Sequence, residues 1–134
     1  MSQKNLKMDH DKKIKDLGRK GEDIAADFLL KKNYEIIDRN FHAQSGEIDL
    51  VAKNSLGEYV LVEVKTRANN NYGYAIESMS KSKLRKIYYA GGSYFLRKMK
   101  LKELPDFQID LIAIQFENGK MEIEHIENIG LQDF

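Results

Sequence analysis

The chain has 134 residues, a net charge of +1 and no cysteine. This length predicts one domain that folds without a disulfide or a structural metal. The lack of cysteine excludes disulfides and thiolate zinc sites and is typical of reducing compartments, so we expect a cytoplasmic protein. No apolar run approaches the ~20 residues of a membrane span, so we expect no membrane partner.

The N-terminal end differs from the rest of the chain. Residues 1–15 are charged and have no apolar centre, which predicts a flexible basic tail and argues against a secretory signal. No internal repeat divides the remainder. We therefore expect one domain over residues 16–130.

The first predicted helix spans residues 16–32. Its apolar stripe includes Ala25 and Leu29, with Gly21 on the same side. A glycine there costs helix stability, and the expected compensation is close approach of the helix to a sheet. Asn33 is the expected stop.

Three strands are predicted next. Residues 34–41 read as a strand, residues 42–45 as a loop and residues 46–67 as a β-hairpin. The buried faces of the two hairpin strands superpose when residues 54–58 form the loop, because a slip by one residue would expose every apolar side chain.

The second half of the chain predicts a helix and two more strands. A polar loop over 68–79 precedes a helix over about 80–98. A central strand, 107–116, leads through Asn118-Gly119, a strong hairpin turn signal, into an edge strand over 120–128. The order α-β-β-β-α-β-β predicts an α/β fold, a mixed central sheet flanked by helices.

The hairpin brings unusual charges together. Alternation places its even-numbered apolar residues on one face: Ile48, Leu50, Ala52, Val60, Val62 and Val64. The other face then holds Val51 and Leu61 with the charged residues Glu47, Asp49, Glu63, Lys65 and Arg67. Asp49 is expected opposite Glu63. Like charges across a ladder are unfavourable, so a positive charge should compensate.

Two interpretations of these charges stay open. Lys65 and Arg67 can make cross-strand pairs with Glu47 and Asp49, each worth roughly 0.2–1 kcal/mol. Alternatively, Asp49 and Glu63 can bind Mg²⁺, or Mn²⁺ in its place, since hard divalent cations prefer carboxylates. Lys65 could then reach an attacking water or a phosphate oxygen. That set suits metal-assisted phosphodiester hydrolysis.

Other acids have both a structural and a functional interpretation. Glu22 lies beside the stripe of the first helix and could point toward the hairpin acids, or stay solvated and paired with a nearby cation. Glu47 is expected to be a rim charge. Asp110 lies in an apolar strand and must be paired, with Arg39 as the expected partner. His10, His42 and His125 show no ligand spacing, so we treat them as structural or exposed.

The basic residues are unevenly distributed. Residues 78–102 hold eight basic residues and no acid, whereas residues 103–134 hold eight acids and one lysine. A solvated helix face is one interpretation; the other is a phosphate-binding helix that uses Lys81, Lys83, Arg85 and Lys86. Five tyrosines lie in or near this stretch: Tyr72, Tyr74, Tyr88, Tyr89 and Tyr94. Some of them can stack on unpaired bases, although most are expected in core or loop positions.

These features match a known pattern. An acid followed by a hairpin with Asp and then Glu-x-Lys resembles the PD-(D/E)xK nucleases, which have the restriction-endonuclease-like fold. More narrowly, "GRKGEDIAADFL", "GEIDLVA", "LVEVKTR" and "FQIDLIAI" resemble the YraN-type uncharacterised protein family, related to archaeal Holliday-junction resolvases. The resemblance covers about residues 16–128.

The resemblance implies roles for individual residues. Asp49 and Glu63 match the metal-binding acids, Lys65 the lysine of the Glu-x-Lys pair, and Glu22 a helical glutamate that assists the metal. Arg67, in the "VKTR" segment, is implied to contact phosphate. Lys83 matches a lysine that opens the second helix.

Two departures from the family pattern accompany this match. Lys81 stands where the family often has a proline, and Ile48 stands where the "PD" label has one. The second proline is often absent in this superfamily.

Three functions follow as hypotheses. The first is a Mg²⁺-dependent endonuclease acting on DNA, with branched or damaged DNA as candidate substrates. The second is a nucleic-acid-binding module with the same fold and little or no catalysis. The third is an interaction protein whose hairpin charges form salt bridges. The resemblance to resolvases also suggests a homodimer.

Overall fold

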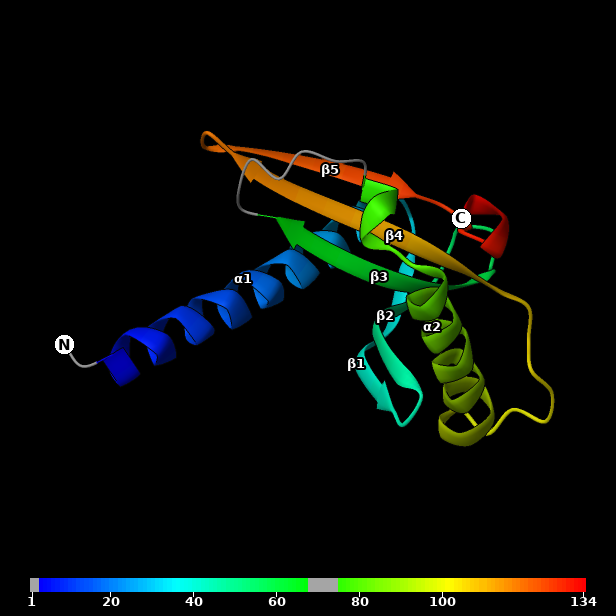
Figure 1. The fold of residues 1–134 in the computed structure, drawn as a ribbon. Coiled ribbons are helices and arrows are strands. Elements are labelled where there is room, and N and C mark those ends of the chain that lie inside the picture. Colours follow the sequence, from blue (N-terminus) through cyan, green and yellow to red (C-terminus); the bar gives the residue numbers. More distant parts are fainter. Residues whose placement is uncertain (1–2, 68–74) are drawn as a thin grey trace.

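The fold of this chain, a computed structural model, is described for residues 3–67 and 75–134 (Figure 1). Its main elements are α1 (Gln3–Lys31), β1 (Glu35–Ala43), β2 (Gly46–Lys53), β3 (Tyr59–Arg67), α2 (Lys81–Ser93), β4 (Phe107–Glu117) and β5 (Lys120–Ile126). Short 3₁₀ turns lie at Ala75–Ser78 and Leu131–Asp133, and a π-turn at Tyr94–Lys98 extends α2. The predicted order α-β-β-β-α-β-β is confirmed.

The five strands form one mixed sheet in the order β1-β2-β3-β4-β5. Only β3 and β4 are parallel, and α2 lies in the crossover that joins them. Residues 54–58 form the loop of the β2–β3 hairpin, as predicted, and Lys53 pairs with Tyr59. Asn118 and Gly119 both have positive φ, which is the geometry of the predicted two-residue hairpin turn.

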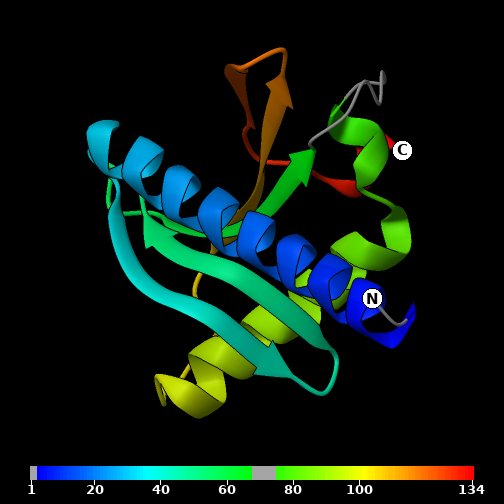
Figure 2. The same ribbon diagram turned by 90° about the vertical axis from the view of Figure 1, so that its left-hand side faces the viewer.

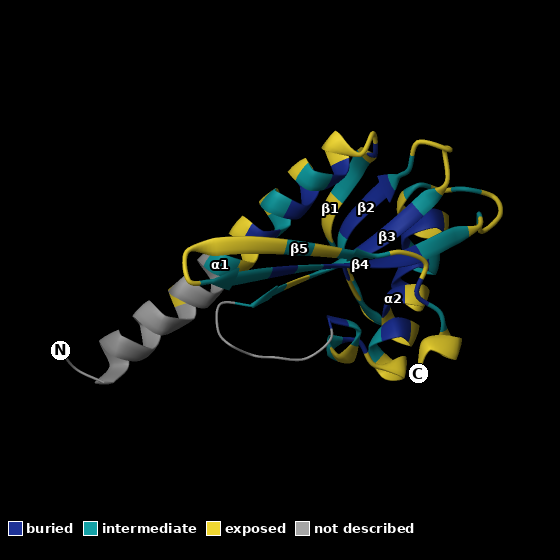
Figure 3. Cartoon of the chain, turned by 90° about the horizontal axis from the view of Figure 1, so that it is seen from above, coloured by how far each residue is buried: buried dark blue, intermediate teal, exposed yellow. Residues whose placement is uncertain are grey.

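Two apolar clusters sandwich the sheet, because α1 and α2 lie on opposite faces of it (Figure 2). Ala25 and Leu29 of α1 pack on Leu50, Val62 and their even-numbered neighbours. The other cluster joins buried residues of α2 to the odd-numbered face, namely Leu84, Ile87, Ala90, Val51, Leu61 and Leu111. Figure 3 shows this burial concentrated in the central strands. The charged face of the hairpin is therefore partly a core face.

Several predicted boundaries were wrong. α1 begins at Gln3, so a helix occupies most of the predicted flexible tail and starts well before the predicted residue 16. The domain boundary after residue 15 stays a prediction. β1 continues to Ala43 and so replaces the first half of the predicted loop, which is reduced to residues 44–45. Asn33 ends α1 with a φ of 66°, as predicted.

No helix in the described part of the chain is both long enough and apolar enough to cross a membrane.

Gly21 is where α1 touches the sheet. A Cβ atom on Gly21 would lie 1.9 Å from Oγ1 of Thr66 on β3, whereas one on Gly18 would meet nothing within 4 Å. We therefore expect Gly21→Ala to lower the free energy of unfolding by about 1–3 kcal/mol, measured in urea. Gly18→Ala, the matched control, should raise it by up to about 1 kcal/mol. Equal effects of the two substitutions would contradict this packing.

Candidate active site at the fork between β2 and β3

The candidate site lies where two neighbouring strands separate. The β2–β3 ladder ends at the pair Leu50–Val62, although β2 continues beside β1 and β3 beside β4. One step beyond this pair, Oδ2 of Asp49 accepts a hydrogen bond of 2.7 Å from the backbone N–H of Val64. The Asp49 side chain thus takes the place of a ladder partner, which holds its carboxylate beside β3.

The fork also explains an error in the predicted faces. Ile48 was expected beside Leu50, but it packs in the cluster on the α2 side of the sheet. β2 keeps its register with β1 through this point, so its separation from β3 after Leu50 is the irregularity that accompanies the change of face.

Asp49 is held in an environment that opposes its charge. Burial raises the pKa of its carboxyl group to about 7, and the negative charge of Glu63 adds to this rise. The hydrogen bond from the backbone N–H of Val64 lowers the pKa and so partly offsets this rise. The charge of Glu22 also raises the pKa of Asp49, so this helical acid lies within electrostatic reach of the fork.

The positive charge that compensates these acids comes from α2. Nζ of Lys83 lies 2.6 Å from Oε1 of Glu63, whose side chain is only 12% exposed. Ser80 caps this end of the helix, with its hydroxyl oxygen 3.1 Å from the N–H of Lys83. The positive pole of α2 therefore also faces the acids. Sequence reasoning assigned Lys83 to phosphate binding and missed this ion pair.

The predicted cross-strand pairs of Lys65 are not formed. Lys65 is exposed and, by alternation, lies on the same side of β3 as Glu63. Among the described residues, none makes an ion pair with Lys65. Glu47 instead pairs with His42, Oε1 to Nδ1 at 3.0 Å, and both side chains are exposed. Glu47 is therefore a rim charge, as expected.

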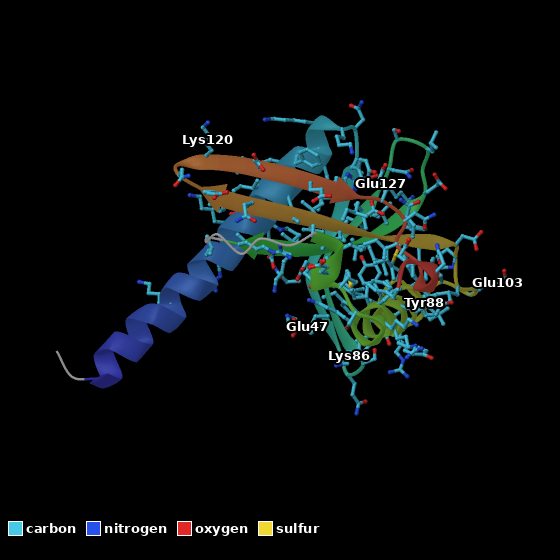
Figure 4. All side chains as sticks on the ribbon, turned by 45° about the horizontal axis from the view of Figure 1, so that its top comes forward. Glu47, Lys86, Tyr88, Glu103, Lys120 and Glu127 are labelled. Atoms are coloured by element: carbon cyan, nitrogen blue, oxygen red, sulfur yellow. The ribbon has the colours of Figure 1, made fainter. Side chains whose placement is uncertain are left out.

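A cavity of about 420 Å³ lies between the fork and α2. Asp49 and Glu63 line one wall, and Ser80, Lys83 and Lys86 line the other. Figure 4 shows Glu47 and Lys86 near one another at this side of the molecule. With Glu47 at its rim, the cavity combines three carboxylates with two lysines, and it is open to a charged ligand.

The remaining predicted phosphate-binding residues lie outside this cavity. Lys81 and Arg85 are exposed on α2. Arg67 is half-buried near the end of β3, where its register partner is Gln115. Tyr72 and Tyr74 lie outside the described residues. The basic residues that the sequence grouped together thus occupy more than one side of α2.

A second polar cluster lies on β4 and β5, on the face of the sheet that α1 covers. Asp110 is fully buried, and its partners are Nε2 of His125 at 2.7 Å, the Gln108 amide at 3.0 Å and the Asn128 N–H at 2.9 Å. The expected pairing with Arg39 was wrong, because Arg39 pairs with Asp23 of α1.

Hydrogen bonding fixes the state of this histidine. Nζ of Lys32 lies 2.7 Å from Nδ1 of His125, and an ammonium group can only donate, so Nδ1 accepts. Nε2 must then carry the proton that is donated to Asp110. His125 is therefore structural, as predicted, and links the end of α1 to β4.

The two clusters differ in how tightly their ligand atoms gather. Within the described residues, Asp110, His125 and Glu127 are the group of three whose ligand atoms lie within 4.8 Å of one another. Glu22, Asp49 and Glu63 do not converge to that degree. Asp110 and His125 are nevertheless hydrogen-bonded to each other, and Glu127 accepts a hydrogen bond of 3.0 Å from the Tyr34 hydroxyl. This group is satisfied internally, whereas the acids at the fork repel each other.

Comparison with known proteins identifies relatives of this chain. The model of a family described as uncharacterised protein family UPF0102 matches residues 21–114. A UPF0102 protein of Syntrophomonas wolfei is 38% identical over 114 residues, which are 85% of this chain and 96% of that protein. A UPF0102 protein of Clostridium beijerinckii is 40% identical over 123 residues, 87% of this chain and 95% of the relative. One from Clostridium kluyveri is 42% identical over 103 residues, 76% and 81% of the two chains.

Proposed function

This chain belongs to the uncharacterised protein family UPF0102, the YraN-type family that its motifs indicated, and we propose that it is a Mg²⁺-dependent endonuclease that hydrolyses phosphodiester bonds in DNA. The observation that carries the proposal is the fork: Asp49 and Glu63 come from different strands and line one cavity. Branched or damaged DNA is the proposed substrate class, on the resemblance to resolvases.

The donor set fits a hard divalent cation. Two carboxylates with a third within electrostatic reach are the oxygen ligands that Mg²⁺ prefers. The raised pKa of Asp49 supports the fit, because it reflects burial of the carboxylate and, second, repulsion by Glu63, and a bound cation opposes both effects. A cation held there supplies charge that polarises a phosphate and lowers the pKa of a water molecule.

The other residues of the site have distinct proposed roles. Glu22 assists from α1, and Lys65 orients water or contacts a phosphate oxygen from the exposed side of β3. Lys81, Arg85, Lys86 and Arg67 bind phosphates. Such contacts give salt-dependent affinity without reading base sequence.

Lys83 competes with the proposed metal for Glu63. The Lys83 side chain is 39% exposed, so water screens its pair with the less exposed Glu63, and we expect a divalent cation to displace it. We expect Lys83→Met to tighten Mn²⁺ binding about two- to five-fold, measured by calorimetric titration. Lys98→Met, which removes a lysine paired with Asp38 away from the fork, should leave the affinity unchanged. Weaker binding by Lys83→Met would show that Lys83 supports the site.

A cleavage assay tests the proposed activity. The purified chain is incubated with linear, flapped, forked and four-way DNA in Mg²⁺, Mn²⁺ or EDTA. We expect metal-dependent cutting of at least one branched substrate, lost in Glu63→Gln and kept in Glu47→Gln. Glu47 is the matched control because it is an exposed acid at the rim of the same cavity. A folded protein that cuts none of these substrates would overturn the proposal.

The second candidate is a nucleic-acid-binding module without efficient catalysis. The Lys83–Glu63 ion pair favours it, because this pair already neutralises one of the acids without a metal. Under that hypothesis the chain binds the same substrates equally in EDTA and Mg²⁺ and cuts none of them. The assay above therefore separates the two candidates.

A further inference from the structure

A second cavity lies beside α2, away from the acids. Its volume is about 430 Å³, within the ~300–1,000 Å³ typical of ligand pockets. The helix contributes Leu84, Arg85, Tyr88 and Tyr89, and the C-terminal segment contributes Asn128 and Leu131. Tyr88 is 49% exposed and Tyr89 63%, so two aromatic rings are open to solvent at its edge.

The aromatic side chains form a corner. The ring centroids of Tyr88 and Tyr89 are 5.9 Å apart with planes at 82°, so the rings are nearly perpendicular. The ring of Tyr88 also packs on that of Phe107, with 5.3 Å between the ring centroids and 37° between the ring planes. A flat ring that enters this corner can stack on one tyrosine and meet the other edge-on, and both arrangements are favourable for aromatic pairs.

The polar groups of the cavity indicate what kind of flat ring it takes. Arg85 makes no ion pair with any residue in the described part of the chain, so its charge is available to an anion. The Asn128 side chain is exposed and offers an amide donor and acceptor. These groups complement a nucleotide. The two tyrosine rings can stack on the base, the Asn128 amide can hydrogen-bond to the edge of the base, and the Arg85 guanidinium can bind the phosphate.

The two cavities are close enough to engage one strand. Lys83 and Lys86 line the cavity of the acids, whereas Arg85 and Tyr88 line the second one. Figure 4 shows Lys86 and Tyr88 on different sides of α2. A helix with its side chains is ~10–12 Å across and stacked nucleotides rise ~3.4 Å, so about three nucleotides span it.

We propose that this second cavity binds an unpaired base of the DNA strand whose phosphates reach the fork. The proposal rests on the DNA-directed function above and defines its substrate class: DNA with at least one unpaired nucleotide. A fully paired base cannot enter without leaving its stack, which costs a few kcal/mol.

The test measures binding in EDTA, so it does not depend on cleavage. Two DNA duplexes of the same sequence each carry a single-nucleotide bulge. The bulged nucleotide has a base in one duplex and is abasic in the other. We expect the full-length protein to bind the base-bearing bulge about 5- to 150-fold more tightly, because stacking is the difference between the probes. Tyr89→Ala should abolish that preference, whereas Tyr89→Phe should keep it.

The controls separate this inference from the proposed activity. Tyr89 is 63% exposed and outside both core clusters of the described residues, so the alanine variant should fold, as circular dichroism can verify. Leu56→Ala, at an exposed residue of the β2–β3 loop, should retain the preference. Equal affinity for the two bulges would overturn the inference even if the protein cuts DNA. A preference without any cutting would support the cavity and overturn only the nuclease proposal.

A second copy of this chain is the other candidate occupant of the cavity to test. Sedimentation of the protein without DNA, at several concentrations, reports whether a second copy covers the cavity. We expect Tyr89→Ala to leave the oligomeric state unchanged. A dimer that this substitution dissociates would assign the cavity to an interface between copies and would overturn the inference.

Discussion

Replacing Asp49 with asparagine should abolish metal-dependent cleavage and, in the absence of metal, make the protein more stable above pH 7. Asparagine keeps an oxygen that can accept the N–H of Val64, so the fork is retained. It removes the charge that burial and Glu63 oppose. The loss of cleavage should exceed the ~10–100-fold typical of losing an outer-shell partner of a metal, because Asp49 is a proposed ligand.

The sign of the stability effect follows from the pKa. The pKa of the Asp49 carboxyl is about 7 in the folded protein and 3.8 in the unfolded chain. Between these values the folded state binds more protons, so the free energy of unfolding falls as the pH rises, and the full loss is present above pH 7. The advantage of Asp49→Asn should therefore be absent below pH 3.8 and grow to about 2–4 kcal/mol at pH 8.

Asp38 supplies a control of opposite sign. A hydrogen bond from Lys98, whose Nζ lies 2.6 Å away, lowers the pKa of Asp38. Asp38 therefore stabilises the fold above pH 3.8, and Asp38→Asn should destabilise the protein at pH 8. Urea unfolding in EDTA at pH 5 and pH 8 measures both variants. An Asp49→Asn protein that is less stable than wild type at pH 8 would refute the proposed repulsion at the fork.

The largest loss of stability is expected from Asp110→Ala. This substitution leaves three donors without their acceptor: Nε2 of His125, the Gln108 amide and the Asn128 N–H. Breaking a buried charged network by removing one partner typically costs ~3–5 kcal/mol. We expect a loss of that size, measured by urea unfolding at pH 7.

Asp110→Asn is the matched variant for this prediction. Its amide oxygen can still accept the N–H of Asn128, so it should cost less than the alanine change. Asp23→Ala breaks the exposed pair with Arg39 and should change stability by no more than about 1 kcal/mol. A loss below about 1 kcal/mol for Asp110→Ala would show that the network does not hold β4 and β5 together.

The order of elements was predictable because it depends on local patterns. Apolar periodicity located the helices and strands, and the Asn118-Gly119 turn located the last hairpin. That turn also fixes the register, since Glu117 pairs with Lys120 and therefore Ile112 with His125. Following the same register two residues further places Asp110 opposite Glu127. The buried network could thus have been found from the sequence, although no ligand spacing is visible along the chain.

The site was only partly predictable because it depends on a departure from regular structure. The hairpin register correctly brought Asp49 beside Glu63, but the ladder ends just before them. Nothing local to β2 indicates that the strand leaves β3 there, so the side of Ile48 was wrong. The partner of Glu63 was also missed, because Lys83 reaches it through the packing of α2 on the sheet.

The central claim is that Asp49 and Glu63 jointly bind a divalent cation. A crystal of the protein soaked in Mn²⁺ and measured for anomalous scattering tests it most directly. We predict a manganese peak within bonding distance of both carboxylates, with Nζ of Lys83 displaced from its 2.6 Å contact with Glu63. A fork without a peak and with that contact intact, or a peak only at Asp110, His125 and Glu127, would contradict the claim.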